Sequence, residues 1–295
     1  MNIISASRRT DIPAFYMPWL MNRLRTGFVC YPNPFSGQVY RVSLRPVDVH
    51  SIVFWSKNYG PLLCHLDELK ERGYQFYFHY TITGCPEAWE PCVPNWQQAT
   101  ETFLKLAEQT SPRHVQWRFD PIVLTDRQRP SFYTERFRDI AKALVGATER
   151  CYISFGTFYG KVQQRLRKAH INFLDPPLQE KLRVIKMLAD IASNYGITLY
   201  ACCQDALVTG KVKKAHCIDG DLLARLFPDR PHVSQQRPTR KQCGCVASRD
   251  IGMYDTCLHG CIYCYANQNR EVTLKQFKSH TPMGEMLTKH YVAGP

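Results

Sequence analysis

The sequence contains no run of about 18 apolar residues, which is the length a helix needs to cross a bilayer. Its first twenty residues include Arg8, Arg9 and Asp11, where a secretory signal peptide needs an uninterrupted apolar segment. Internal repeats and low-complexity segments are absent as well. These absences predict a cytoplasmic globular protein that makes no use of a membrane.

A cytoplasmic chain has little use for a disulfide framework, because that compartment keeps thiols reduced. The sequence nevertheless has 13 cysteines. Those scattered singly, and expected mostly as small core residues, are Cys30, Cys64, Cys85, Cys92 and Cys151. The other eight lie between Cys202 and Cys264. This clustering predicts a metal or iron–sulfur site late in the chain.

The length of 295 residues and a hydrophobic fraction of 44% fit one α/β barrel, or a domain with an appendage. The formal net charge is +13, from 38 basic and 25 acidic residues. This charge favours an anionic partner such as a nucleic acid or nucleotide. The basic residues are spread out, with only modest concentrations at 127–138 and 225–241. Charge alone therefore identifies no partner.

Short apolar segments alternate with segments of helical periodicity through the first two thirds of the chain. Strands are predicted at the N-terminus and at 51–55, 75–82, 114–119, 150–155 and 197–203, and helices at 14–25, 60–73, 95–109, 132–144 and 178–195. The alternation predicts a parallel sheet, most simply a complete or partial (β/α) barrel of the TIM type. We expect a barrel body at residues 1–208 and a Cys-rich segment at 209–295 that completes the barrel.

Polar side chains follow the predicted strands, at the end where ligands sit in parallel α/β folds. The candidates for cofactor binding are Ser5, Ser7, Asp11, Ser56, Lys57, Thr81, Arg118 and Asp120. Each residue alone could be a helix cap or part of an ion pair, as Arg118 with Asp120. Their recurrence at several strand ends favours a site for a polar, zwitterionic ligand that bears a nucleoside.

Cys257, Cys261 and Cys264 form a C-x3-C-x2-C motif, which can turn three thiolates toward one centre. Thiolates are the usual ligands of iron–sulfur clusters and of structural zinc. Three ligands leave one iron of a cubane cluster without a protein ligand, so that iron can hold another molecule. The alternative is a zinc knuckle, although zinc sites more often show paired C-x2-C units.

Five further cysteines precede this motif. Cys243 and Cys245 form a C-G-C pair, and Cys217 together with Cys202 or Cys203 would complete a set of four thiols. This set predicts an auxiliary iron–sulfur cluster or a zinc site. Because Cys202 and Cys203 are adjacent at a predicted strand end, we expect their side chains to point in opposite directions, one of them into the core.

The cysteine motif, followed at once by Tyr265, resembles the signature of radical S-adenosylmethionine (SAM) enzymes, in which the open iron holds the amino and carboxylate groups of SAM. Residues 3–13, 52–58, 117–122 and 243–267 resemble a bacterial domain-of-unknown-function family, family 1848, over essentially the whole chain. The strand order is also similar to radical SAM proteins of the spore photoproduct lyase type. Here it is circularly permuted, because the cysteine loop comes last instead of after the first strand.

This resemblance implies that residues 5–11 correspond to the loop that binds the amino group of SAM. Ser56, Lys57 and Thr81 would lie near its carboxylate and ribose. The implied activity is reductive cleavage of SAM by a [4Fe–4S] cluster, followed by hydrogen abstraction from an unknown substrate, with flavodoxin or ferredoxin as electron donor. The likeness to a DNA-repair enzyme makes a nucleic acid or nucleotide a candidate substrate. A plain Gly-Gly-Glu segment is missing from this chain.

His259 and Tyr263 lie close enough to the motif in sequence to tune such a cluster; the alternative is that they only fill the loop. A rival interpretation is a zinc-stabilised nucleic-acid-binding protein without catalysis, which would be colourless and would bind less tightly as salt increases. A hydrolytic barrel that uses Asp11, Asp120 and a histidine is a third alternative, but the sequence has no paired-histidine motif for it.

Overall fold

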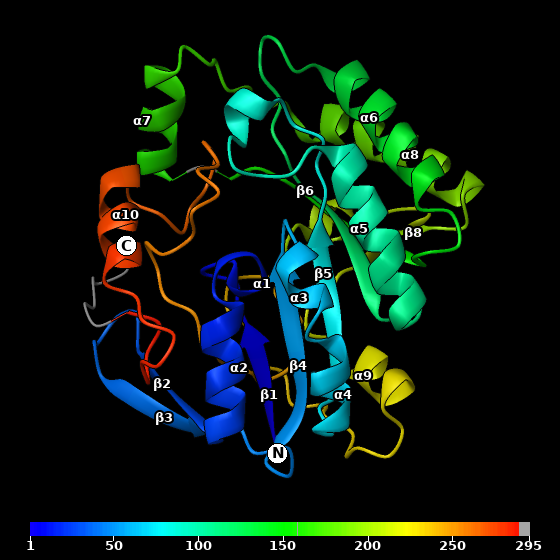
Figure 1. Cartoon of the computed structure of the whole chain (residues 1–295). Coiled ribbons are helices and arrows are strands. Elements are labelled where there is room, and N and C mark those ends of the chain that lie inside the picture. The colour runs from blue at the N-terminus through cyan, green and yellow to red at the C-terminus, as the bar shows by residue number, and fades with distance from the viewer. Residues whose placement is uncertain (158, 289–295) are drawn as a thin grey trace.

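The computed structural model of the chain describes residues 1–157 and 159–288. A parallel sheet of eight strands lies at its centre, in the order β10-β1-β4-β5-β6-β7-β8-β9 (Figure 1). These strands are β1 (Asn2–Ala6), β4 (Val49–Ser56), β5 (Phe76–Thr81), β6 (Val115–Ile122), β7 (Arg150–Phe155), β8 (Thr198–Ala201), β9 (Val212–Lys214) and β10 (Arg249–Asp250). No pairing joins β9 to β10 within the described residues, so the sheet is open and is consistent with a partial (β/α) barrel.

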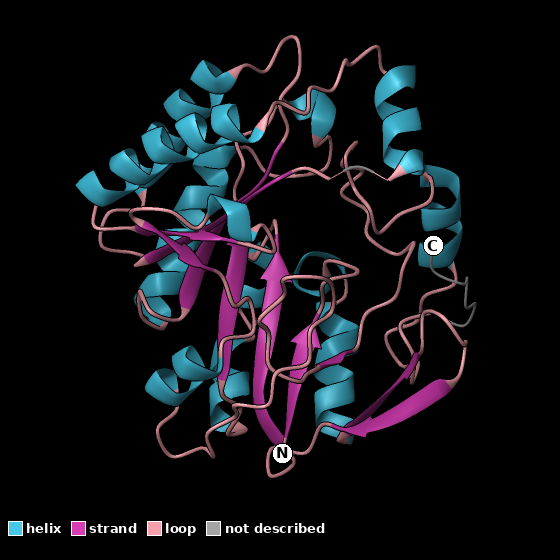
Figure 2. Cartoon of the chain, turned by 180° about the vertical axis from the view of Figure 1, so that it is seen from behind, coloured by secondary structure: helices cyan, strands magenta, loops and turns pink. Residues whose placement is uncertain are grey.

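Helices cover the outer face of the sheet, as the strand–helix alternation predicts (Figures 1 and 2). They are α1 (Ile12–Phe15), α2 (Met17–Thr26), α3 (Gly60–Leu63), α4 (Leu66–Glu71), α5 (Trp96–Gln109), α6 (Pro130–Ala143) and α8 (Leu178–Asn194). The further elements are α7 (Gly160–Lys168), α9 (Gly220–Leu226), α10 (Arg270–Lys278), the short 3-10 helices η1 (Glu87–Trp89) and η2 (Asp205–Leu207), and a separate antiparallel pair, β2 (Phe28–Pro32) and β3 (Val39–Ser43).

Two predicted helices are each divided in the structure. The helix expected at 14–25 is α1 and α2, which meet at Tyr16, and the helix expected at 60–73 is α3 and α4. Pro18 lies in the first turn of α2, where a missing N–H costs no helical hydrogen bond, so it suits a new helix start at this point. Strand β2 was not expected, because Pro32 and Pro34 mark that segment as a turn.

The two faces of the sheet have different partners because side chains alternate along each strand. Ile52 and Phe54 of β4 join the large core that packs against the helices. Val53, between them, lies in a second core on the inner face, together with Tyr77 and Tyr152. The inner core also contains Cys202, Cys217, Cys243 and Cys245. The inner face is therefore packed by irregular segments that carry thiols.

Residues 209–295 contribute a strand to each edge of the sheet. Strand β9 pairs with β8, and β10 pairs with β1 through Ile4 with Arg249 and Ser5 with Asp250. The cysteine loop follows β10 directly, so it starts beside the first strand of the chain although it comes late in the sequence. The domain boundary near Thr209 stays a prediction.

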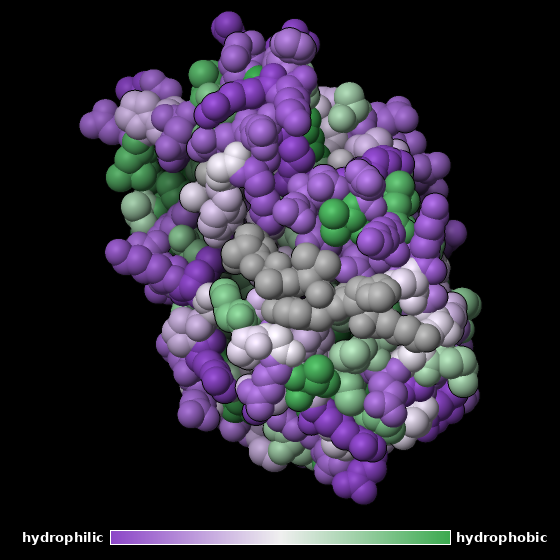
Figure 3. Space-filling model, turned by 90° about the vertical axis from the view of Figure 1, so that its left-hand side faces the viewer, coloured by the Kyte–Doolittle hydropathy of each residue, from purple (hydrophilic) through white to green (hydrophobic). Residues whose placement is uncertain are grey.

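Among the described helices, none combines the length and the apolar character required to span a membrane. On the side of the molecule seen in Figure 3, polar residues predominate and hydrophobic residues form small separate groups.

Candidate functional site

The loop after β10 brings the three motif thiols into one neighbourhood. Cys257 lies within electrostatic range of Cys264, and Cys261 lies within range of both. Cys261 is buried, whereas the other two are half-buried. The loop thus places three thiols in a mostly enclosed space with some access from solvent, as a site that receives a small molecule needs.

Backbone donors are directed at these sulfurs. The N–H groups of His259 and Asp11 donate to the sulfur of Cys257, and the N–H of Ala266 lies 3.3 Å from Sγ of Cys264. Burial still raises the pKa of Cys257, and the nearby Asp11 carboxylate raises it further. The free thiol is therefore protonated at neutral pH, and a bound metal would have to displace the proton.

Asp11 is the point at which the β1 loop, the end of β4 and the cysteine loop meet. Its Oδ1 accepts from Ser56 Oγ at 2.7 Å and from the N–H of Ala14 at 2.9 Å, which caps α1. Its Oδ2 accepts from the N–H of Lys57 at 2.8 Å and pairs with His259 Nε2 at 2.6 Å. Because both carboxylate oxygens of Asp11 accept hydrogen bonds, Asp11 and Ser56 hold the cysteine loop in position. A role in cofactor binding stays a prediction for both residues.

Lys57 extends from the end of β4 to a buried carboxylate, Glu90, that no sequence pattern marked as a site residue. Its Nζ lies 2.8 Å from Glu90 Oε1, which also accepts from Thr83 Oγ1 at 2.8 Å and from the hydroxyl of Tyr263. A carboxylate in a proline-rich loop directly after β5 was the only sequence signal for Glu90. Tyr263, expected as a possible tuning residue, thus ties the cysteine loop to this ion pair.

Both members of the ion pair are charged. Burial alone would lower the pKa of Lys57, but Glu90 and the nearby Cys261 outweigh it, and the net pKa is raised. Burial alone would raise the pKa of Glu90, but Lys57 outweighs it, and the net pKa is lowered. An ammonium group therefore lies within electrostatic range of one of the three motif thiols.

The hydroxyls of Ser5 and Ser7 turn toward the stem of the cysteine loop. They donate to Asp250 of β10, Ser5 to Oδ2 at 2.8 Å and Ser7 to Oδ1 at 2.6 Å. The N–H of Arg8 and the guanidinium of Arg9 bind the same carboxylate. Asp250 was missed because a two-residue strand has no periodicity. It joins the first and last strands, and the role of both serines in SAM binding stays a prediction.

Gly252 has no room for a side chain beside this junction. A Cβ atom there would lie 2.1 Å from Ser7 Oγ and 2.5 Å from Ser7 Cβ. Ser7 is buried and held by Asp250, so it cannot move aside. We expect Gly252→Ala to lower the free energy of unfolding by about 1–3 kcal/mol through overpacking.

Urea denaturation of the metal-free protein measures this loss. Gly160→Ala is the matched control, because a Cβ atom at Gly160 has no heavy atom within 4 Å in its surroundings. Equal stability of the two variants would contradict the close contact at Gly252.

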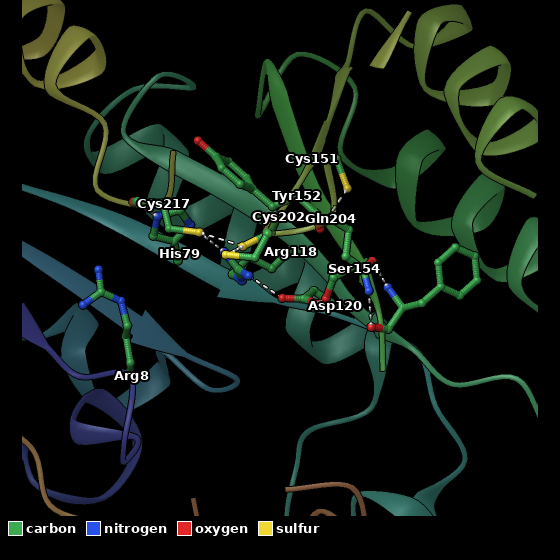
Figure 4. A network of polar contacts seen from close by, with 12 residues as sticks. Arg8, His79, Arg118, Asp120, Cys151, Tyr152, Ser154, Cys202, Gln204 and Cys217 are labelled. Atoms are coloured by element: carbon green, nitrogen blue, oxygen red, sulfur yellow. Dashed lines mark hydrogen bonds and ion pairs between the residues drawn. The ribbon is translucent and has the colours of Figure 1, made fainter. Parts of the chain in front are cut away.

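Arg118 and Asp120 form the ion pair that the sequence analysis gave as an alternative. Ser154 donates to the same carboxylate (Figure 4). Arg118 does more than pair, because its Nη1 donates to Cys217 Sγ at 3.2 Å. Figure 4 shows its guanidinium between the carboxylate and the sulfur. The end of β6 thus faces the second set of thiols, while contact of these residues with SAM stays a prediction.

Thr81 is half-buried and lies in the wall of a cavity of about 380 Å³. Thr83, Glu90 and Arg136 line the same cavity. Pro91, also in its wall, lies 3.2 Å from where a Cβ atom of Gly260 would be, so the cavity adjoins the cysteine loop.

The second set of thiols also comes together, and it includes Cys203. Cys202 Sγ lies 3.2 Å from Cys217 Sγ and 3.9 Å from Cys203 Sγ. The expectation that Cys202 and Cys203 point in opposite directions is therefore wrong. Strand β8 ends at Ala201, and Cys203 has a positive φ of 53°, so strand alternation no longer applies.

In the part of the chain that is described, no group of three or more His, Cys, Asp or Glu side chains forms a ready site for a single metal ion. A cubane cluster makes a different demand, because each thiolate binds a separate iron and the ligands surround a larger body.

No curated protein matches this chain. A family model described as a domain of unknown function, DUF1848, matches residues 3–266. The match spans β1, the cysteine loop and all of the sheet between them, and the chain therefore belongs to the DUF1848 family.

Proposed function

We propose that this protein is a radical SAM-type enzyme, with a [4Fe–4S] cluster on Cys257, Cys261 and Cys264 and a substrate still to be identified. The observation that carries the proposal is the position of the cysteine loop. It follows β10, which lies at the edge of the sheet beside β1. In the spatial order of the sheet, β10 is the first strand. The cysteine loop therefore follows the first strand in space, as the resemblance to a permuted radical SAM protein implies.

The residues present suit such a cluster. Three thiols lie in one mostly enclosed loop, N–H groups point at two of the sulfurs, and a lysine ammonium lies near Cys261. Soft thiolate ligands suit iron–sulfur clusters, and N–H groups near the sulfurs raise their reduction potential.

When bound and reduced, the cluster would supply the electron that splits SAM into methionine and a 5′-deoxyadenosyl group able to take a hydrogen atom from the substrate. The protein's own residues would hold the cluster and limit its contact with solvent. Asp11 joins three segments around the loop, and the Lys57–Glu90 pair places a fixed positive charge beside the thiols. Burial of Cys261 limits the access of water.

We assign the nucleoside part of SAM to the cavity at the carboxyl end of β5. Its volume of about 380 Å³ is at the lower end of small-molecule sites, which run from roughly 300 to 1,000 Å³. Thr81 and Thr83 supply hydroxyl groups to its wall, and Pro91 connects it to the cysteine loop. Hydroxyl groups suit a ribose, because they both donate and accept hydrogen bonds.

Anaerobic incubation of the iron-loaded protein with dithionite and SAM tests the proposal. We expect 5′-deoxyadenosine and methionine in equal amounts, both absent when dithionite is omitted. A protein with an intact cluster that forms neither product would contradict radical SAM chemistry. A colourless protein that holds only zinc would instead favour the nucleic-acid-binding alternative.

A further inference from the structure

Five thiols form a closed ring of contacts on the inner face of the sheet. Around the ring, Cys202 contacts Cys217 and Cys203, Cys203 contacts Cys243, Cys243 contacts Cys245, and Cys245 contacts Cys217. All except Cys203 are buried. They come from three separate segments, so only the tertiary structure brings them together. Isolated core cysteines, such as Cys151 on the opposite face, show no such convergence (Figure 4).

Two guanidinium groups contact this ring, and a third lies within electrostatic range of it. Arg118 Nη1 lies 3.2 Å from Cys217 Sγ, and Arg240 Nη2 lies 3.8 Å from Cys202 Sγ. Arg8 is within electrostatic range of Cys245 and Cys217, and its Nη2 is buried without a hydrogen-bond acceptor. Of the three, Arg118 is buried, Arg8 is half-buried and Arg240 is exposed. The buried charge of Arg118, which also pairs with Asp120, becomes more favourable when the sulfurs carry negative charge. The position of Arg118 therefore favours thiolates at this site.

The ring is also held by its backbone. The carbonyl of Cys217 accepts from Tyr77 OH at 2.7 Å and from His79 Nε2 at 2.6 Å. The N–H of Ile218 lies 3.4 Å from Cys245 Sγ. Between the two cysteines of the C-G-C pair, a Cβ atom at Gly244 would lie 2.9 Å from the ring of His216. These contacts orient the thiols in advance, as neighbouring hydrogen bonds do around metal ligands.

We propose that Cys202, Cys217, Cys243 and Cys245 bind a second iron–sulfur cluster on the inner face of the sheet. These four are the buried members of the ring, whereas Cys203 is half-buried and is left as a neighbour. Four thiolates are a usual ligand set for an iron–sulfur cluster. Binding would replace the contacts between thiols and release their protons.

The second site lies close to the first. The hydroxyl of Tyr265, the residue after Cys264, donates to the carbonyl of Arg8 at 2.6 Å. The side chain of Arg8 lies within electrostatic range of Cys245 and Cys217, and Arg240 is near both Tyr265 and Cys202. Both cysteine sites therefore border the region of Arg8 and Arg240. The second site nevertheless has its own ligands, so the proposal does not depend on radical SAM activity.

The test uses the full chain with Cys257, Cys261 and Cys264 replaced by alanine, which removes the first site. After anaerobic reconstitution with iron and sulfide, we expect equal amounts of iron and sulfide and absorbance in the visible range. Adding Cys217→Ala and Cys245→Ala should remove at least nine tenths of both elements. Adding Cys203→Ala instead should leave both unchanged, which makes it the matched control.

Zinc in place of iron, no metal at all, or iron that survives Cys217→Ala/Cys245→Ala would overturn the proposal. Because these substitutions could impair folding, a second measurement uses the wild-type chain. Alkylation in the native state, followed by mass spectrometry, should spare the four ligand thiols until acid destroys the cluster. Modification of the four at the same rate before and after acid treatment would equally overturn it.

Discussion

Replacement of Cys261 by alanine is expected to abolish reductive cleavage of SAM. Loss of an outer-sphere partner alone commonly costs a metal site about 10–100-fold, so loss of a ligand should cost at least about 100-fold. Cys261 is the buried member of the motif and lies within range of both other thiols and of Lys57. The measurement is the rate of 5′-deoxyadenosine formation per chain, with iron content determined in parallel.

The matched control is Cys92→Ala. Cys92 is exposed, and its backbone, which alanine retains, bonds with His259 of the cysteine loop. We expect wild-type rates from this variant. A Cys261→Ala protein as active as Cys92→Ala would show that this thiol is not a ligand, whatever the iron content.

Replacement of Asp11 by alanine is expected to produce the largest loss of stability that we predict, about 3–5 kcal/mol in the free energy of unfolding. The substitution leaves Ser56 Oγ, His259 Nε2 and two backbone N–H groups without their acceptor. Ser56 and His259 are buried, so water cannot readily replace the lost hydrogen bonds. The measurement is urea denaturation of the metal-free protein under reducing conditions.

Asp67→Ala serves as the control, because the side chain of Asp67 is 88% exposed and pairs only loosely with Lys70 at 3.5 Å. An exposed pair of this kind contributes about 0–1 kcal/mol. If Asp11→Ala were no less stable than Asp67→Ala, the three segments around the cysteine loop would not depend on this carboxylate.

The structure departs from the sequence predictions mainly at the ends of helices and strands. Helical periodicity located α5, α6 and α8 well, but it ran through Tyr16 and missed the division between α1 and α2. Strand alternation assigned opposite directions to Cys202 and Cys203, which fails because β8 ends at Ala201, two residues earlier than predicted. Both errors arise at element ends, where local patterns stop applying.

In the candidate site, too, the sequence identified single residues but not their distant partners. The sequence named Lys57 and Asp11, yet their partners Glu90 and His259 are 33 and 248 residues away. It named Ser5 and Ser7 as candidate cofactor-binding residues, but it did not indicate that both donate hydrogen bonds to Asp250. Local periodicity and residue spacing carry no information about contacts between residues so far apart in the sequence.

By itself, the sequence determined the strand–helix alternation, the polar strand ends and the C-x3-C-x2-C spacing, because each of these depends on residues close together in the chain. Only the tertiary structure decided that β10 lies beside β1, that Glu90 pairs with Lys57 and that five thiols meet beneath Arg118. These contacts join segments that come together only when the sheet assembles and its inner face is covered. Which residues become neighbours then depends on strand order and packing, and neither can be read from local spacing.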